Sequence, residues 1–352
     1  MRRVRMTKLG AVVLAGTLVT MGAAGCGGGG NGGGGGGGGS DKPGHNVGMA
    51  YDIGGRGDKS FNDAAYRGLT QAKSQLGITF KDLEAKDGES DNDKAQRLEL
   101  LAKSGHDPVI GIGFAYSKAI GEVAKKYPKV HFGIVDDASN HEKNVTNLVF
   151  TENESSYLVG AAAALKTKTD TIGFVGGVNT PLIQKFQAGF QAGAKKINPK
   201  IKIKVGYISQ PPDNSGFKDP AKGKTMTQGM IDDGADVVYG AAGLSNNGVI
   251  AACAKNKKWA IGVDSDQYLS APADQKQYVM TSALKKVDTA VFNFIKQVQD
   301  GTAKGGTETF DLKSDGVGYS TSNKAAIKDL EPKLDALKKK IISGEIKAPT
   351  KP

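Results

Sequence analysis

The sequence predicts an α/β protein in which two successive units each contain a parallel sheet flanked by helices. Past residue 45 one pattern recurs: a short run rich in β-branched residues, a loop, and an amphipathic stretch of about 12 to 17 residues. The pattern restarts near Thr171, and the chain after its glycine tract is long enough for two domains. Strands that alternate with helical stretches are typical of parallel sheets.

The first unit is expected to begin with a strand at 47–51. Ser60 and Asp63 form a capping-box pattern that predicts a helix start, after which apolar residues fall on one helical face. The other strands of this unit are expected at 78–83, 109–114, 130–135 and 145–150, and its other helices at about 92–104, 117–127 and 154–167.

The second unit is expected to contain strands at 171–176, 201–208, 237–240, 259–263 and 278–282. Two late helices, at about 287–300 and 323–343, can pack on either unit, which would make the domains discontinuous. Residues 316–319 indicate a late strand or bulge. Because open α/β sheets bind ligands at the carboxyl ends of their strands, the loops directly after strands are the place to search for a site.

The first 43 residues read as an export signal and a tether. A basic start, an apolar run from Leu9 to Met21 and a small-residue site before Cys26 predict a signal peptide at 1–25. The apolar run is shorter than the roughly 20 residues that a membrane-spanning helix needs. The arrangement resembles a bacterial lipoprotein signal, which implies a lipid anchor at Cys26 and a glycine-rich tether through residue 43. The alternative is a plain secretory signal in which Cys26 is incidental.

Composition excludes several classes of protein. The formal net charge is +11, but the lysines and arginines form no dense block, so we expect no nucleic-acid partner. If Cys26 carries lipid, Cys253 stands alone and no intrachain disulfide is available; Cys253 is expected to be a small buried helix residue. The four histidines show no close ligand pairing, so neither a metal nor another cofactor is expected.

The loop after the first strand is a candidate binding site for a flat polar ring. It contains Asp52 and three glycines, and it ends where a helix start presents free backbone N–H groups beside Phe61 and Asn62. An aromatic face next to amide and carboxylate groups suits such a ring. The alternative is that Phe61 only packs against the helix and Asn62 is solvated.

Carboxylates also stand at strand ends. Asp136 and Asp137 follow the fourth strand, and Asp264 and Asp266 follow the strand at 259–263. Carboxylates in a crevice accept hydrogen bonds from hydroxyls or amines and repel phosphate, so they favour a neutral, hydroxyl-rich ligand over a nucleotide. The alternative is that each caps a helix.

The second unit supplies Phe217 beside Gly216, and two aromatic side chains from two units can sandwich a ring. Lys285 lies near an expected crossover between the units, where a lone lysine is usually on the surface. Catalytic patterns are missing: the segment ending in Gly223-Lys224-Thr225 has Lys218 where a phosphate loop needs glycine, and no G-x-S-x-G is present. We therefore expect a binding protein and not an enzyme.

Three groups of residues, at 57–62, at 173–190 and at 262–267, carry a resemblance to a known family. Together they resemble the basic membrane protein family of substrate-binding lipoproteins, which includes nucleoside receptors of ABC importers. The resemblance runs from about 46 to 345. It implies a two-lobed type I periplasmic-binding-protein fold, with the N-terminal lobe at 44–160 plus about 282–303 and the C-terminal lobe at 161–281 plus about 304–352.

The resemblance also implies roles for individual residues. A purine would stack between Phe61 and Phe217, while an aspartate and a lysine would hold ribose hydroxyls, with Asp266 and Lys286 as neighbouring candidates for that pair. The full set of ligand-binding residues that it implies is Asp52, Phe61, Asn62, Asp136, Phe217, Gly243, Asp264 and Lys285.

The expected function is therefore capture of a nucleoside, most simply a purine nucleoside, by lobe closure and its delivery to an ABC permease. The protein is expected to be a monomer on the outer face of the cell membrane, without cofactor. Three alternatives remain open: a receptor for a sugar or another small polar ligand, a surface sensor that signals through a partner, and a nucleoside hydrolase.

Overall fold

The protein is described by a computed structural model of residues 43–352. The predicted signal peptide, Cys26 and nearly all of the predicted tether lie outside these residues. None of the helices between residues 43 and 352 has the length and apolar character needed to cross a bilayer.

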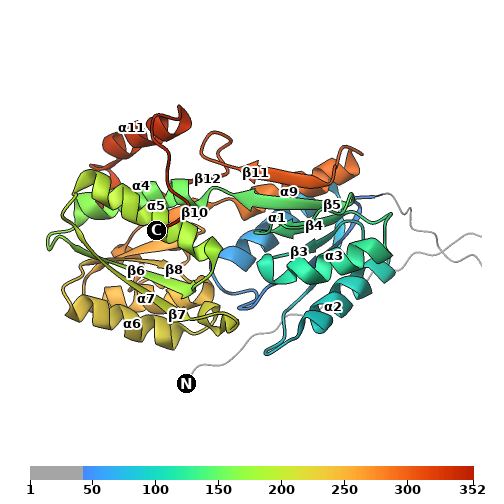
Figure 1. Ribbon diagram of the computed structural model, residues 1–352, viewed down its shortest axis with the longest axis horizontal. Helices are drawn as coiled ribbons and strands as arrows, with labels where there is room; N and C mark the ends of the chain where they lie inside the picture. The colour runs from blue at the N-terminus through green and yellow to red at the C-terminus, as the bar shows by residue number, and fades with distance from the viewer. Residues whose placement is uncertain (1–42) are drawn as a thin grey trace, which may run out of the picture. The chain divides into compact units, whose positions relative to one another are not determined.

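The first of two six-stranded sheets has the strand order β11-β5-β4-β3-β1-β2 and is parallel throughout (Figure 1). We call this sheet and the helices packed on it the first lobe. Its strands are β1 (Asn46–Ala50), β2 (Thr79–Leu83), β3 (Val109–Gly111), β4 (Phe132–Val135), β5 (Val145–Phe150) and β11 (Gly306–Phe310).

The second sheet has the order β12-β10-β9-β8-β6-β7, with only β12 antiparallel, and belongs to what we call the second lobe. The two orders correspond position by position, so β4 and β9 hold equivalent places. The strands of the second sheet are β6 (Thr171–Val178), β7 (Lys202–Ser209), β8 (Val237–Ala241), β9 (Trp259–Asp264), β10 (Val279–Lys285) and β12 (Val317–Tyr319).

Helices cover both faces of each sheet. In the first lobe α1 (Phe61–Leu76) and α9 (Val287–Gln299) pack together on one face, and α2 (Asp91–Lys103) and α3 (Ser117–Lys126) cover the other. In the second lobe α4 (Glu152–Lys166) and α5 (Pro181–Ile197) are paired, opposite α6 (Pro220–Asp232) and α7 (Asn246–Lys255).

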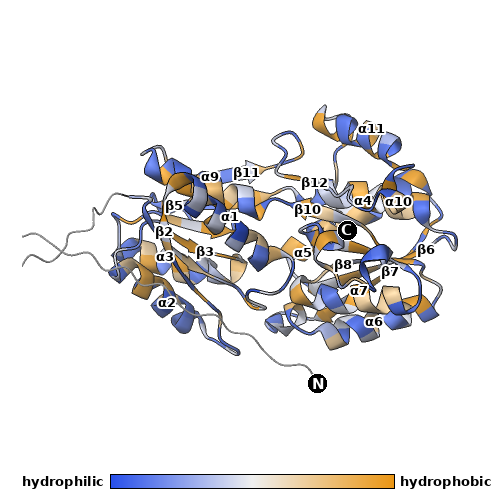
Figure 2. Ribbon diagram, turned by 180° about the vertical axis from the view of Figure 1, so that it is seen from behind, coloured by the Kyte–Doolittle hydropathy of each residue, from blue (hydrophilic) through white to orange (hydrophobic). Residues whose placement is uncertain are grey.

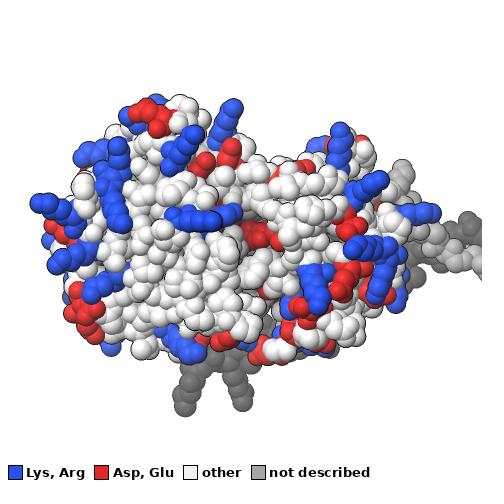
Figure 3. Space-filling model, viewed as in Figure 1, with Lys and Arg blue, Asp and Glu red and all other residues white. Residues whose placement is uncertain are grey.

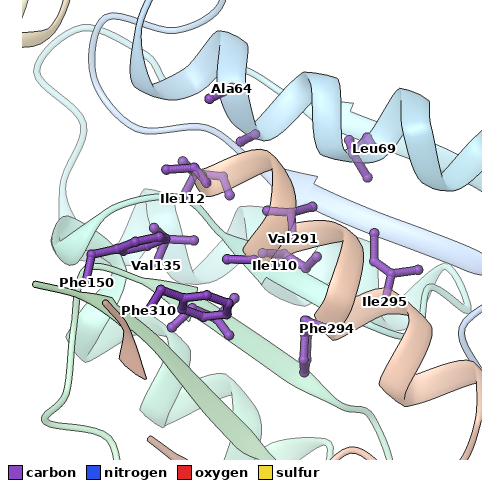
Figure 4. Packing of buried hydrophobic residues seen from close by; sticks show 14 of the residues in the cluster. Ala64, Leu69, Ile110, Ile112, Val135, Phe150, Val291, Phe294, Ile295 and Phe310 are labelled. Carbon is purple, nitrogen blue, oxygen red and sulfur yellow. The ribbon is translucent and has the colours of Figure 1, made fainter. Parts of the chain in front are cut away.

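The cores lie between these helices and the strands. Figure 4 shows Leu69 of α1, Ile110 of β3 and Val291, Phe294 and Ile295 of α9 within one buried cluster. In Figure 2 hydrophobic residues gather on strands such as β3 and β6, while α2 and α6 carry many hydrophilic residues. Strands buried on both faces by helices are expected to be apolar in this way.

Within the described residues the chain passes between the sheets three times. β5 leads into α4, which contacts β10 and β12; β10 leads into α9, which packs on α1; and β11 leads to β12. Each lobe is therefore completed by segments from distant parts of the sequence.

The late strand β11 differs from the sequence-based expectation. Residues 304–352 were expected with the C-terminal lobe, but β11 pairs with β5 in the first sheet. Its sequence, Gly-Thr-Glu-Thr-Phe, buries only Phe310 because β11 is an edge strand. An edge strand needs no continuous apolar run, so the pattern gave no sign of it.

The helix expected at 323–343 is divided into α10 (Lys324–Ile327) and α11 (Glu331–Ile342). Pro332 lies in the first turn of α11. Because proline lacks a backbone N–H and fits the first turn of a helix, it favours a new start at this point over a continuous helix.

Candidate ligand-binding site

A cavity lies where the carboxyl ends of strands from the two lobes meet. The space between the atoms at this place, open solvent at the mouth included, is about 550 Å³. In Figure 3 atoms of Asp or Glu residues are visible in the hollow near the middle of the molecule. The wall is formed by Asp52, Ile53, Asp58, Phe61, Asn62, Gly113, Phe114, Asp136, Leu182, Ile183, Phe186, Phe217, Ala241, Ala242, Gly243, Val263, Asp264 and Lys285.

All eight residues that the sequence singled out for ligand binding lie on this wall, and their roles remain predictions. The neighbouring candidates do not line the cavity. The carboxylate of Asp266 accepts hydrogen bonds from the hydroxyls of Ser320 and Ser322, and Lys286 pairs with Asp315. The structure therefore brings Asp264 and Lys285, and not their neighbours, to the cavity.

The start of α1 is capped by Asp58. Its carboxylate accepts hydrogen bonds from the backbone N–H groups of Ser60, Asn62 and Asp63 at 2.9, 2.8 and 3.1 Å. Ser60 occupies the N-cap position but makes no side-chain cap, so the predicted capping box of Ser60 and Asp63 is wrong. The Ser60 hydroxyl instead donates to Asp264 Oδ2 in the second lobe at 2.6 Å.

Asn62 holds the first loop together. Its side-chain Oδ1 accepts from the Asp52 N–H at 3.2 Å, and its Nδ2 donates to Asp58 at 3.2 Å. Burial raises the pKa of Asp52 to about 7. Gly113, two residues after β3, has a φ of +105°, and a Cβ at this position would lie 2.1 Å from Asp52 Oδ2. Only glycine therefore lets the chain pass this close to the carboxylate.

Four phenylalanine rings contribute to the wall. Phe61 and Phe114 come from the first lobe, Phe186 and Phe217 from the second. The rings of Phe114 and Phe217 meet edge to face, with centroids 6.3 Å apart and planes at 67°. Sequence analysis assigned no role to Phe114 or Phe186. Phe114 was expected to be the last residue of the strand at 109–114, but β3 ends at Gly111, so Phe114 falls in the loop after the strand. Phe186 lies within α5, where its position resembles that of a core residue.

Two aspartates mark equivalent strand ends. Asp136 directly follows β4 and Asp264 ends β9; their φ angles, +69° and +61°, lie in the left-handed region that non-glycine residues rarely adopt. Burial raises the pKa of Asp264 to about 6, against the lowering effects of Lys285 and the Ser60 hydrogen bond. Burial also raises the pKa of Asp136, which Lys285 opposes. Strain of this kind is frequent at functional sites.

Lys285 ends β10 and is 2% exposed. Its Nζ lies 2.5 Å from Asp136 Oδ2 and 3.3 Å from Glu152 Oε1. It also lies 5.0 to 5.7 Å from the ring centres of Phe61, Phe150 and Phe186. Burial alone would lower the pKa of Lys285, but the nearby carboxylates outweigh it and raise this pKa above its usual value. The ammonium therefore stays charged at neutral pH.

Two further kinds of reactive group, metal ligands and the cysteine thiol, were considered within residues 43–352. Among residues 43–352 no group of three or more His, Cys, Asp and Glu side chains could hold a metal ion. Cys253 is buried on α7, and burial raises the pKa of its thiol far above the ordinary value. What the cavity offers is aromatic surface, hydrogen-bond acceptors and one ammonium.

Comparison with known proteins identifies the family. Residues 45–351 match the family described as ABC transporter substrate-binding protein PnrA-like. The chain is 36% identical over 320 residues to the ABC transporter nucleoside-binding protein BmpA of Lactococcus lactis, covering 85% of this chain and 88% of that protein. It is 36% identical over 326 residues to an uncharacterised lipoprotein of Pyrococcus abyssi, covering 89% of this chain and 77% of that protein.

A solved structure of an ABC transporter solute-binding protein from Aeropyrum pernix superimposes with a TM-score of 0.75 at 28% identity, covering 86% of this chain and 93% of that one. The resemblance seen in the sequence and the expected two-lobed periplasmic-binding-protein fold are thereby confirmed. This chain belongs to the PnrA-like family of ABC transporter substrate-binding proteins.

Proposed function

We propose that this protein captures a nucleoside, most simply a purine nucleoside, between its two lobes and delivers it to an ABC permease. The observation that carries the proposal is the wall of the cavity. Phe61 and Phe217 come from different lobes, and the same wall holds Asp264 and Lys285. Flat aromatic surfaces suit a base, and the charged pair suits sugar hydroxyls. A relative that is named as nucleoside-binding supports the same class of ligand.

The charges of the cavity favour a nucleoside over a nucleotide. Four carboxyl groups, those of Asp52, Asp58, Asp136 and Asp264, line it together with a single ammonium. A phosphate group placed here would meet more negative than positive charge and would lose its hydration. Buried carboxylates instead accept hydrogen bonds from hydroxyl and amino groups.

Closure of the lobes would complete the site. Ser60 of the first lobe contacts Asp264 of the second, and Lys285 of the second contacts Asp136 of the first. A ligand that touches both walls stabilises the closed arrangement by contacts that an open arrangement lacks. Binding and release of this kind make and break no covalent bond, and we propose no catalytic activity.

Equilibrium binding tests the ligand class. Calorimetry with purified protein and a panel of nucleosides, free bases and sugars should give the tightest binding with a nucleoside. Phe61→Ala and Phe217→Ala should each cost about 1 to 3 kcal/mol of binding free energy, by analogy with base stacking on single strands. Tightest binding of a sugar, with both variants unaffected, would refute the stacking arrangement and favour a sugar receptor. Steady conversion of inosine or adenosine to products would show a hydrolase.

Transport and anchoring need separate experiments. We propose that Cys26 carries lipid and holds the protein, as a monomer, on the outer face of the membrane, which the lipoprotein relative supports. Incorporation of a labelled fatty acid by the wild type and its absence in Cys26→Ser would bear this out. Deletion of the gene should abolish nucleoside uptake; unchanged uptake with a lost transcriptional response to nucleosides would favour a sensor.

A further inference from the structure

Glu152 is a buried carboxylate beside Lys285, a residue of the cavity wall. It is the first residue of α4, directly after the first passage of the chain between the lobes, and it is 1% exposed. It does not line the cavity. Because isolated buried charges are costly, a carboxylate in this position needs a nearby cation.

That cation is Lys285. Glu152 Oε1 lies 3.3 Å from Lys285 Nζ, and Glu152 Oε2 lies 3.4 Å from Lys185 Nζ on α5. Together with Asp136 these groups form a row in which negative and positive charges alternate, from the cavity wall to the partly exposed Lys185. Glu152 is the member of this row that pairs with Lys285 without lining the cavity.

The row divides unequally between the lobes. Glu152, Lys185 and Lys285 lie on α4, α5 and β10 of the second lobe, where α4 contacts both α5 and β10. Asp136 instead follows β4 of the first lobe. A relative movement of the lobes would therefore separate Lys285 from Asp136 and leave it with Glu152. The lysine keeps one carboxylate whatever the position of the first lobe.

We propose that Glu152 is a positioning residue that holds the Lys285 ammonium in the orientation needed to meet ligand hydroxyls; this inference rests on the proposed nucleoside-binding function. An ammonium has three N–H donors. The ammonium donates a hydrogen bond to Asp136 and lies 3.3 Å from Glu152 Oε1 without a hydrogen bond to it. Because Lys285 also lines the cavity, its remaining N–H donors are available to a ligand. Without Glu152 the ammonium would be held by Asp136 alone, and its position would then follow the first lobe.

The test compares ligands that differ only in their hydroxyls. Binding of adenosine and inosine is measured by calorimetry beside binding of their 2′,3′-dideoxy forms. Wild type should prefer the hydroxylated form by roughly 10- to 100-fold, the range for hydrogen bonds to a charged group. Glu152→Gln should reduce this preference by roughly twofold or more, because residues in contact are coupled by at least about that factor. Affinity for the dideoxy form should change little.

Glu154→Gln is the matched control. Glu154 lies one half-turn further along α4 and accepts hydrogen bonds from the Thr151 hydroxyl and the Leu312 N–H, both at 2.9 Å. It makes no contact with Lys285 among the ion pairs of residues 43–352. This variant disturbs the same helix start, and it should keep the preference for the hydroxylated form.

The double variant Lys285→Met/Glu152→Gln tests whether Glu152 acts through Lys285. Lys285→Met should itself abolish most of the preference, and adding Glu152→Gln should then have no further effect on it. If Glu152→Gln does not fold by circular dichroism, Glu152→Asp, which keeps the charge and withdraws it by one methylene, takes its place and must also lower the preference.

The outcomes are distinguishable. An unchanged preference in the Glu152 variant, or an equal loss of affinity for both forms of the nucleoside, would overturn this inference and leave the proposed function intact. Failure of the wild-type protein to bind any nucleoside would overturn the proposed function and the inference with it.

Discussion

Asp136 and Asp264 hold equivalent places in the two lobes and are satisfied in different ways. Both stand at the end of the third strand of a six-stranded order, and both have a left-handed backbone. Asp136 meets the ammonium of Lys285, whereas Asp264 meets the hydroxyl of Ser60; in each case the partner comes from the other lobe. The same backbone framework thus supports an ionic contact on one side of the cavity and a hydrogen bond to a neutral group on the other.

The difference shows how one repeated architecture can present two chemistries. The position of each carboxylate is set by the strand order and the left-handed turn, which are alike in the two lobes. The chemistry is set by a single residue on the opposing lobe. We expect the Asp136–Lys285 ion pair and the Asp264–Ser60 hydrogen bond to contribute differently to the free energy of unfolding.

The largest effect is expected from Lys285→Met on the ionic side. The change leaves Asp136 buried without its cation and leaves Glu152 with Lys185 alone. It should lower the free energy of unfolding by about 3 to 5 kcal/mol in urea denaturation at neutral pH. Lys286→Met is the control, because its partner Asp315 is exposed and the pair should contribute no more than about 1 kcal/mol. Equal losses of unfolding free energy in Lys285→Met and Lys286→Met would show that the buried ion pair is no more important for stability than the exposed one.

Ser60→Ala tests the neutral side and should have a smaller effect. The Ser60 hydroxyl is fully buried and donates to a carboxylate, so its loss should cost about 1.5 to 3 kcal/mol of unfolding free energy. Ser74→Ala, at an exposed position of the same helix, should be neutral or slightly stabilising because alanine has the higher helix propensity. A cost for Ser60→Ala as large as for Lys285→Met would contradict the comparison.

The dependence of stability on pH tests the burial of Asp264. Because burial raises the pKa of Asp264 from 3.8 to about 6, the folded protein binds more protons than the unfolded chain between these values. This group's contribution to stability is fully present below about pH 4 and is lost as pH rises through 6. Asp264→Asn should therefore lose less stability than wild type over this interval, by up to about 1.4 kcal/mol per pH unit.

Asp136→Asn provides the contrast. It removes a carboxylate that Lys285 contacts, so it should destabilise the protein at pH 7, where Asp264→Asn should be close to neutral. Urea denaturation at a series of pH values measures both. A profile for Asp264→Asn that runs parallel to wild type would show that this carboxyl titrates alike in the folded and unfolded protein.

The smallest effect is expected at Phe114, whose edge meets Phe217 across the cavity. Phe114→Leu should weaken nucleoside binding by about 0.5 to 1.5 kcal/mol, the range for an aromatic pair. Phe80→Leu removes a similar edge contact, with Tyr66, away from the cavity and should leave the affinity unchanged. Equal affinities of Phe114→Leu and wild type would indicate that the ring pair forms independently of the ligand.

Sequence reasoning predicted the framework well. The recurring pattern of apolar runs and amphipathic stretches placed β1 to β10 within a few residues, and the rule that ligands bind at strand ends pointed to Asp136 and Asp264. The resemblance to a known family then brought in Gly243 and gave Lys285 a role, where pattern alone suggested a surface residue.

What sequence reasoning missed depends on contacts between distant segments. Ser60 fits a capping box locally, but its hydroxyl donates a hydrogen bond to Asp264, about two hundred residues away. Asp58 caps the helix in its place. Glu152 reads as an ordinary acidic residue at a helix start, where such residues are favourable. Only the fold reveals that Lys285 lies beside it.

The edge strand β11 has a consequence for how the protein folds. It pairs with β5 across more than 150 residues of intervening chain, which include most of the second lobe. Until residues 306–310 arrive, β5 is an unpaired sheet edge, which is a template for association with other chains. Contacts of such high sequence separation also slow folding. A chain truncated before residue 306 should therefore aggregate through β5, even though nearly all of the first lobe's own sequence would be present.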